Sequence, residues 1–267
     1  MSINEVVCSF DIECAGSNVH KNSILQIGAV VMELDEFGEI KIHDIFDVCI
    51  KLKDDVCERR NEIIKNTAIE ICILPKNNEM SVRDLCYKMN MKIKDLGTEE
   101  EFEKRCLEEF WHNNEHPKKR ILLKEILDNG VDKRLAYEDL FHFLVGVRKK
   151  FPNILNISDN SPVDLARISL EFQKYDYNSL EFIGGKYNGF GLDTEDFIKG
   201  VSFAKKWNFD EYDHRKLTNF EEEFKKLVEK NKNLIKKKTK VLFQEHSAVY
   251  DAIKIGQEYL LVKNLLK

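Results

Sequence analysis

The sequence predicts an α/β fold in which a mixed sheet is flanked by helices, and three observations support this. The first 50 residues contain segments that alternate apolar and polar side chains, as strands do. From residue 135 onward the apolar side chains mostly recur with a helical period, and a short apolar strand at 154–157 interrupts that pattern. Strands that come early and helices that dominate later favour a mixed sheet packed by helices.

The start of the chain is expected to form an antiparallel meander. Residues 6–13 alternate, so a strand there carries Asp11 and Glu13 on the same face. Segments 23–34 and 40–50 are rich in Ile and Val and predict two further strands. The residues between them, Asp-Glu-Phe-Gly at 35–38, are typical of a turn.

Helices are expected through the rest of the chain, at 135–150, 163–175, 194–205, 220–234 and 246–266. Pro152 ends the first of these, and 158–162 is expected to be a loop before the second. Thr194 is a candidate N-cap for the third helix, and Thr218 or Asn219 for the fourth. The glycine-rich segment 184–191 is expected to be a loop.

The composition indicates one folded domain, 1–267, of an ordinary globular kind. The chain is 43% hydrophobic and 33% charged, which excludes a chain that is disordered throughout. A net charge of −5 argues against a protein that holds nucleic acid by bulk electrostatics alone. The net charge does not exclude a protein that binds an anionic substrate partly through metal ions.

The seven cysteines, all within the first 106 residues, form no Cys-x-x-Cys pair and predict free thiols rather than a disulfide framework. Residues 1–7 lack the features of a secretory signal, and no apolar run approaches the length of a membrane span. The expectation is therefore a protein of a reducing compartment, cytoplasm or nucleus, that is neither secreted nor membrane-bound.

Asp11 and Glu13 are the sharpest local feature. Two carboxylates on one strand face repel each other, and a divalent cation such as Mg²⁺ or Mn²⁺ is the usual compensation. The alternative is an exposed strand face with two solvated acids, which the pair alone does not exclude.

Three motifs in order resemble those of the DEDD exonuclease superfamily. Phe-Asp-Ile-Glu-Cys-Ala-Gly at 10–16, followed by Gln-Ile-Gly at 26–28, resembles the first motif. Ser-Asp-Asn-Ser-Pro-Val-Asp-Leu at 158–165 resembles the second, with Asn160 and Asp164 in the Asn and Asp positions. His-Ser-Ala-Val-Tyr-Asp-Ala at 246–252 is similar to the third motif in its DEDDh (DnaQ-like, RNase T-like) form.

Two weaker matches, Asp193-Thr194 and Lys216-Leu217, fall between the second and third motifs in the expected order. The resemblance covers residues 6–50 and 154–262 and implies a ribonuclease H-like fold. It also implies a 3′-to-5′ exonuclease that acts on DNA or RNA with a free 3′ end and releases nucleoside 5′-monophosphates. Family members are often dimers, so a homodimer is a further expectation.

The resemblance assigns roles to individual residues. Two divalent cations, Mg²⁺ or Mn²⁺, would be held by four carboxylates, those of Asp11, Glu13, Asp164 and Asp251. His246 would act as the general base that takes a proton from the attacking water. Contacts to the terminal nucleotide would come from Cys14, Ala15 and Asn160.

The chain departs from the family in two places. Cys14-Ala15 replaces a more usual Thr-rich pair, which puts the contacts to the terminal nucleotide in doubt. The gap between the first and second motifs is longer than the family needs, so 51–130 is expected to be an insertion that forms a helical lobe beside the site. Within it, Trp111 and the basic residues 118–120 are interpreted as a core aromatic beside a solvated charged face, in preference to a nucleic-acid contact.

Two alternatives stay open. Asp159 follows the strand 154–157 directly and competes with Asp164 as the metal ligand of the second motif. Loop chemistry around Asp159 and the family pattern both favour Asp164. The protein could also be a catalytically inactive binding or regulatory protein on an exonuclease scaffold, although all five family positions are filled.

Overall fold

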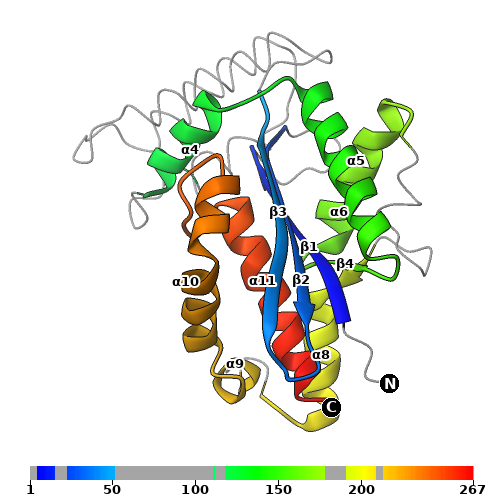
Figure 1. Cartoon of the computed structure of the whole chain (residues 1–267), viewed down its shortest axis with the longest axis vertical. Coiled ribbons are helices and arrows are strands. Elements are labelled where there is room, and N and C mark those ends of the chain that lie inside the picture. The colour runs from blue at the N-terminus through cyan, green and yellow to red at the C-terminus, as the bar shows by residue number, and fades with distance from the viewer. Residues whose placement is uncertain are drawn as a thin grey trace, which may run out of the picture.

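The protein is an α/β structure in which a five-stranded mixed sheet is flanked by helices (Figure 1). The structure is a computed structural model, and it describes residues 5–15, 23–51, 111, 118–177, 191–208 and 213–266. The predicted α/β class, with a mixed sheet between helices, is therefore confirmed.

The sheet has the strand order β3-β2-β1-β4-β5. The strands are β1 (Glu5–Cys14), β2 (Ile24–Leu34), β3 (Ile40–Cys49), β4 (Leu155–Ser158) and β5 (Leu192–Asp193). The first three pair antiparallel, as the predicted meander requires, whereas β4 lies parallel to β1 and β5 lies parallel to β4. The predicted turn at 35–38 is also confirmed, since the Gly38 N–H donates to the Asp35 carbonyl at 3.1 Å.

Helices pack on both faces of the sheet. They are α4 (Lys118–Asp128), α5 (Lys133–Lys150), α6 (Ser161–Lys174), α8 (Thr194–Lys205), α9 (Asp213–Leu217), α10 (Phe220–Lys238) and α11 (Ala248–Asn264). In Figure 1, α10 and α11 lie on one side of the sheet, and α5 and α6 lie on the other.

The alternation of β1 separates two apolar cores. Cys8, Phe10 and Ile12 contribute to the core shared with α5 and α6. Val7, one residue out of phase, contributes to the core shared with α10 and α11. Each large apolar side chain that is fully buried stabilises the fold by about 1.5–3 kcal/mol. The same alternation directs Asp11 and Glu13 toward the α11 side.

Several helix boundaries differ from the prediction. The loop predicted at 158–162 is confirmed only as a turn at 159–160, because β4 runs to Ser158 and α6 begins at Ser161. Pro162 lies in the first turn of α6, where the missing N–H costs nothing. Thr194 is not an N-cap: the Asp193 carboxylate caps α8 by accepting from the Asp196 N–H at 3.0 Å. Asn219 does occupy the N-cap position of α10, but no side-chain cap hydrogen bond forms, and the helix continues to Lys238.

The region 51–130, expected to be an insertion, is described only in part. Trp111 is fully buried, as predicted for a core aromatic, and α4 is helical and packs against β2. The prediction of a helical lobe falls mostly on residues outside the described ones. Of the cysteines, Cys8 and Cys49 are free thiols, the Cys14 sulfur accepts a hydrogen bond from Arg167, and the other four also lie outside the described residues. No helix among the described residues is long and apolar enough to cross a membrane.

The first turn of α11 lies directly on β2 at Gly28. A Cβ atom at Gly28 would lie 2.6 Å from the Val249 nitrogen and still closer to the Ala248 carbonyl group. The backbone of α11 therefore occupies the space that any other side chain at Gly28 would fill. Gly28 pairs with Asp11 across the strands, so this contact brings α11 to the carboxylate of β1.

Gln26 fixes the same helix terminus by hydrogen bonds. Its side-chain oxygen accepts from the Ala248 N–H at 3.1 Å, and its side-chain nitrogen donates to Asp47 Oδ1 at 2.7 Å. Asp47 also accepts from the Lys240 N–H at 2.5 Å. The Gln-Ile-Gly segment thus positions the N-terminus of α11 through one glycine and one buried amide.

Substitution Gly28→Ala should destabilise the fold by about 1–3 kcal/mol, because the new methyl group meets helix backbone that cannot rotate away. Gly146→Ala is the matched control. No atom lies within 4 Å of the added methyl at this exposed position in α5, so it should stabilise by about 0.5–1 kcal/mol. Urea unfolding in the presence of EDTA measures both. Equal stability of the two variants would contradict the close contact at Gly28.

Candidate metal centre

Five carboxylates converge where β1, the end of β4, α6 and α11 meet. The ligand oxygens of Asp11, Glu13 and Asp251 lie within 4.8 Å of one another. Those of Asp11, Asp159 and Asp164 also lie within 4.8 Å of one another. All four acids expected from the sequence are therefore brought together, and Asp159, which loop chemistry disfavoured, joins them.

Asp11 belongs to both groups, so two triads of oxygen ligands share one carboxylate. Each triad is able to hold a hard divalent cation, for which carboxylate oxygens are the preferred protein ligands. Asp11 Oδ2 is also buried, and no described residue donates a hydrogen bond to it. A buried carboxylate oxygen without a donor is costly, and a bound cation would remove that cost.

The pKa values of the cluster indicate crowded negative charge. Burial, then the neighbouring Glu13, raises the pKa of Asp11 well above its ordinary range. Burial, then Asp251, does the same for Glu13. Burial also raises the pKa values of Asp164 and Asp251 to about 7. Burial and the crowding of like charges therefore disfavour the ionised carboxylates, which is the situation that divalent cations relieve.

The second motif holds Asp164 in the first turn of α6. The Asn160 carbonyl accepts from the Asp164 N–H at 2.9 Å, and the Ser158 hydroxyl donates to Asp164 Oδ2. Asn160 itself is exposed at the N-cap position, and its side chain makes no cap hydrogen bond. An exposed amide at this edge is compatible with the contact to a substrate that the resemblance implies.

Asp193, at the end of β5, and Thr194, at the start of α8, support this motif. Asp193 Oδ2 accepts from the Ser161 N–H at 3.1 Å, and the Thr194 hydroxyl donates to the Ser158 carbonyl at 3.2 Å. The Asp-Thr match found in the sequence therefore joins β5 to the end of β4 and the start of α6, and so helps to position Asp159 and Asp164.

The third motif sits where the chain enters α11. His246 precedes the helix and has φ +67°, a left-handed conformation in which His is more frequent than most residues. Its backbone N–H donates to Asp251 Oδ2 at 2.9 Å. This hydrogen bond ties the half-buried His246, which lies before the helix predicted to include it, to one carboxylate of the cluster.

Cys14 and Ala15, which the resemblance assigns to contacts with the terminal nucleotide, are partly and fully buried, respectively. Ala15 is fully buried and its N–H donates to the Ser23 carbonyl at 2.9 Å, so neither its methyl group nor its amide is open to a nucleotide in this structure. Cys14 is half-buried, its thiol accepts from Arg167 Nη1 at 2.8 Å, and its carbonyl accepts from the Trp111 indole N–H at 3.4 Å.

Three basic side chains on α4 and α6 are buried, and none of them is among the predicted site residues: Lys119, Arg120 and Arg167. Arg167 is 3% exposed on α6 and lowers the pKa of Asp164 against the effect of burial. Its position three residues after Asp164, on the same side of a helix, was a signal that could have found it. The prediction that 118–120 form a solvated face is wrong for Lys119 and Arg120, which are 5% and 9% exposed. Nothing in their local pattern indicated burial.

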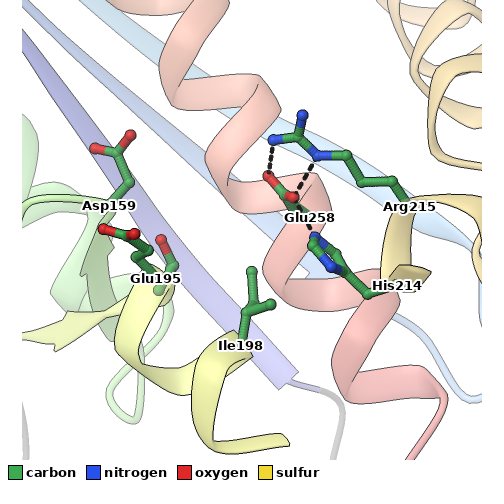
Figure 2. A pocket seen from close by; sticks show the side chains of 7 residues that line it. Asp159, Glu195, Ile198, His214, Arg215 and Glu258 are labelled. Atoms are coloured by element: carbon green, nitrogen blue, oxygen red, sulfur yellow. Dashed lines mark hydrogen bonds and ion pairs between the residues drawn. The ribbon is translucent and has the colours of Figure 1, made fainter. Parts of the chain in front are cut away.

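A polar cavity of about 180 Å³ opens beside Asp159. It is lined by Asp159, Thr194, Glu195, Ile198, His214, Arg215 and Glu258. In Figure 2, Asp159 and Glu195 face the cavity from one side, with Glu258, Arg215 and His214 opposite them. Glu258 accepts from Arg215 Nε at 2.6 Å and from Arg215 Nη2 at 3.0 Å, and it is bonded to His214 Nε2 at 2.6 Å. Asp159 therefore belongs both to the cluster and to the wall of an adjoining cavity.

The metal-free protein should lose stability as the pH rises from about 4 to about 7. The pKa values of Asp164 and Asp251 rise from 3.8 to about 7 on folding, so the folded state holds these protons more tightly. Their stabilisation is complete below pH 4 and is lost as the pH passes through 7, with a slope on the order of 1.4 kcal/mol per pH unit for each group. Urea unfolding in EDTA at a series of pH values measures this slope.

In the same experiment, Asp251→Asn should flatten the slope, and Mg²⁺ should remove the loss at pH 7 by binding only the folded state. Stability that increases between pH 5 and pH 7 in EDTA, or a slope that Asp251→Asn leaves unchanged, would contradict the crowded-carboxylate description.

No protein-family model matches this chain, and a search of curated proteins finds no match to it. The case for a function therefore rests on the three sequence motifs and on the geometry of the carboxylate cluster that they form.

Proposed function

We propose that the chain is a metal-dependent 3′-to-5′ exonuclease of the DEDDh type, with a ribonuclease H-like fold. It hydrolyses phosphodiester bonds of DNA or RNA and releases nucleoside 5′-monophosphates. The observation that carries the proposal is the pair of carboxylate triads that share Asp11. The order of the motifs along the chain supports it, because each motif supplies residues to the same cluster.

The residues present fit divalent cations. The triads offer only oxygen ligands, which favours Mg²⁺ or Mn²⁺ over softer metals. Asp11, Glu13 and Asp251 would hold one ion, and Asp11 with Asp164 and Asp159 would hold a second. When bound, such ions supply Lewis-acid chemistry, which stabilises the negative charge that develops on the phosphate.

The protein's own side chains supply the remaining steps. An imidazole titrates near neutral pH, so a ring nitrogen of His246 is suited to accept the proton of the attacking water. The hydrogen bond from the His246 N–H to Asp251 holds this residue beside the cluster. The exposed Asn160 and the half-buried Cys14 lie next to ligands of the two triads, where contacts to the terminal nucleotide are expected.

Asp11→Asn should lower the rate of hydrolysis by at least about a thousandfold, since the loss of both cations removes several kcal/mol of transition-state stabilisation. Asp128→Asn, an exposed acid on α4, should keep the wild-type rate. The assay uses 5′-labelled DNA and RNA oligonucleotides with Mg²⁺ or Mn²⁺ and follows product length. A ladder that shortens from the 3′ end supports the proposal.

Three results would contradict it. Release of labelled mononucleotide at the earliest times would indicate the opposite polarity, and cleavage of a circular substrate would indicate an endonuclease. A folded wild-type protein that binds the oligonucleotides but releases no product with either metal would identify a binding protein on an exonuclease scaffold.

His246→Ala should lose about two to four decades of rate, the usual contribution of a general base. The divalent-ion affinity of this variant, followed by calorimetry, should stay close to that of the wild type, because His246 is not a proposed ligand. His246→Asn, which tolerates the left-handed conformation at φ +67°, is a second variant that separates loss of the base from backbone strain. If His246→Ala loses metal affinity but keeps a normal rate at saturating metal, His246 is a metal ligand and not the general base.

A further inference from the structure

The cavity beside Asp159 is enclosed by segments that lie far apart in the chain. Its lining comes from the turn after β4, the start of α8, the helix α9 and the middle of α11. Asp159 also supplies one ligand oxygen to the triad with Asp11 and Asp164. The cavity and the proposed metal centre therefore share one side chain.

The wall formed by α9 and α11 is an internal network. The Glu258 carboxylate accepts two hydrogen bonds from Arg215 and is bonded to His214, which is 1% exposed. Arg215 thus balances the charge of Glu258, and these charge-assisted bonds occupy the carboxylate within the protein. This wall is built to hold α9 against α11 and gives the cavity a fixed shape.

The opposite wall offers hydrogen-bond acceptors. Asp159 and Glu195 are exposed, and Figure 2 shows both side chains on the same side of the cavity. Glu195 Oε1 pairs with Lys199 at 2.7 Å, but both side chains are about half exposed, so this pair is weak. Each carboxylate has two oxygens and several lone pairs. This wall therefore suits a neutral group that donates hydrogen bonds and disfavours a phosphate.

The position of the cavity indicates which part of a nucleic acid would enter it. A phosphate held at the two triads borders Asp159, and the groups bonded directly to that phosphate are sugars, whereas each base lies one sugar further away. The cavity has a volume of about 180 Å³. Pockets for whole drug-sized ligands have roughly 300–1,000 Å³, so this one suits part of a nucleotide. Ile198 adds an apolar contact for the carbon side of a ring.

We propose that the cavity holds the ribose next to the scissile phosphate, and that Glu195, together with Asp159, accepts a hydrogen bond from its 2′-hydroxyl. The 2′-hydroxyl is the group by which a protein distinguishes RNA from DNA, so the enzyme prefers RNA. This rests on the proposed function, because it takes a phosphodiester to be bound at the triads. Glu195 lies on α8, outside the three motifs, and is a specificity-determining residue.

The test measures kcat/KM for removal of the first nucleotide from a 5′-labelled oligoribonucleotide of fixed sequence, with Mg²⁺ or Mn²⁺. Two further substrates carry a single 2′-deoxy sugar at the last or the next-to-last nucleotide, and a third carries it in the middle of the strand. One of the two terminal deoxy substrates should be cleaved about ten- to hundredfold less efficiently by the wild type, the usual effect of losing a hydrogen bond to a charged group. The substrate with the central deoxy sugar should stay within about twofold of all-RNA.

Glu195→Ala should reduce this discrimination to about threefold or less, because the acceptor is lost. Glu195→Gln keeps a neutral acceptor and should give an intermediate value. Two controls should keep the wild-type discrimination. Asp196→Asn removes an exposed charge from the same turn of α8, and Lys199→Ala removes the ion pair while the Glu195 carboxylate remains. Circular dichroism checks that each variant is folded.

Equal cleavage of the all-RNA and terminal deoxy substrates by the wild type overturns this inference, as does a discrimination that both Glu195 variants leave unchanged. A rate that depends on the identity of the terminal base, and loses that dependence in Glu195→Ala, assigns the cavity to a base and also overturns it. Metal-dependent hydrolysis in these three cases leaves the proposed function in place. A folded wild-type protein that hydrolyses none of the substrates overturns both.

Discussion

The contact between the first turn of α11 and β2 is the constraint on which the rest of the site depends. Because Gly28 has no side chain, the helix backbone reaches the sheet, and the buried amide of Gln26 bonds to the Ala248 N–H. This brings Asp251 to the carboxylates of β1 from a position more than 200 residues further along the chain. A displacement of α11 by the width of a methyl group would separate the ligands that the first triad requires.

The site is assembled at the expense of stability. Burial and mutual repulsion raise the pKa values of four of its acids, so the folded chain holds groups together that would separate in water. The two apolar cores on either side of the sheet supply the stabilisation that offsets this. Such a distribution, with a stable scaffold around an unfavourable cluster, is the one expected where function rather than stability has selected the residues.

Much of the scaffold was predictable from the sequence, because its signals are local. Alternation in 6–13 predicts the strand and places Asp11 and Glu13 on one face, as observed. The helix predicted at 246–266 begins two residues later, at Ala248, and leaves His246 just before it. The sequence predicts a start of α6 two residues later than observed, because Asp-Asn-Ser-Pro is equally compatible with a loop and with a cap followed by a first turn. The same local chemistry predicts a turn residue at Asp159, although the turn directs its carboxylate at Asp11 and Asp164.

The buried cations were not predictable in the same way. Lys119 and Arg120 follow the exposed Lys118 in the sequence, and they are buried on a helix that packs against β2 and is hydrogen-bonded to the segment before α11. Burial of this kind depends on contacts between segments far apart in the chain, and no window of neighbouring residues contains that information. The resemblance also does not reach this region, which lies within 51–130.

The hydrogen bond between Gln26 and the Ala248 N–H has a consequence for how a phosphate group can be bound. A helix N-terminus ordinarily offers free backbone amides and a partial positive charge, which makes it a natural receptor for anions. In α11 the first of these amides is already bonded to a side-chain oxygen of the sheet. The Ala248 N–H therefore anchors the helix to the sheet and is not open to an anion.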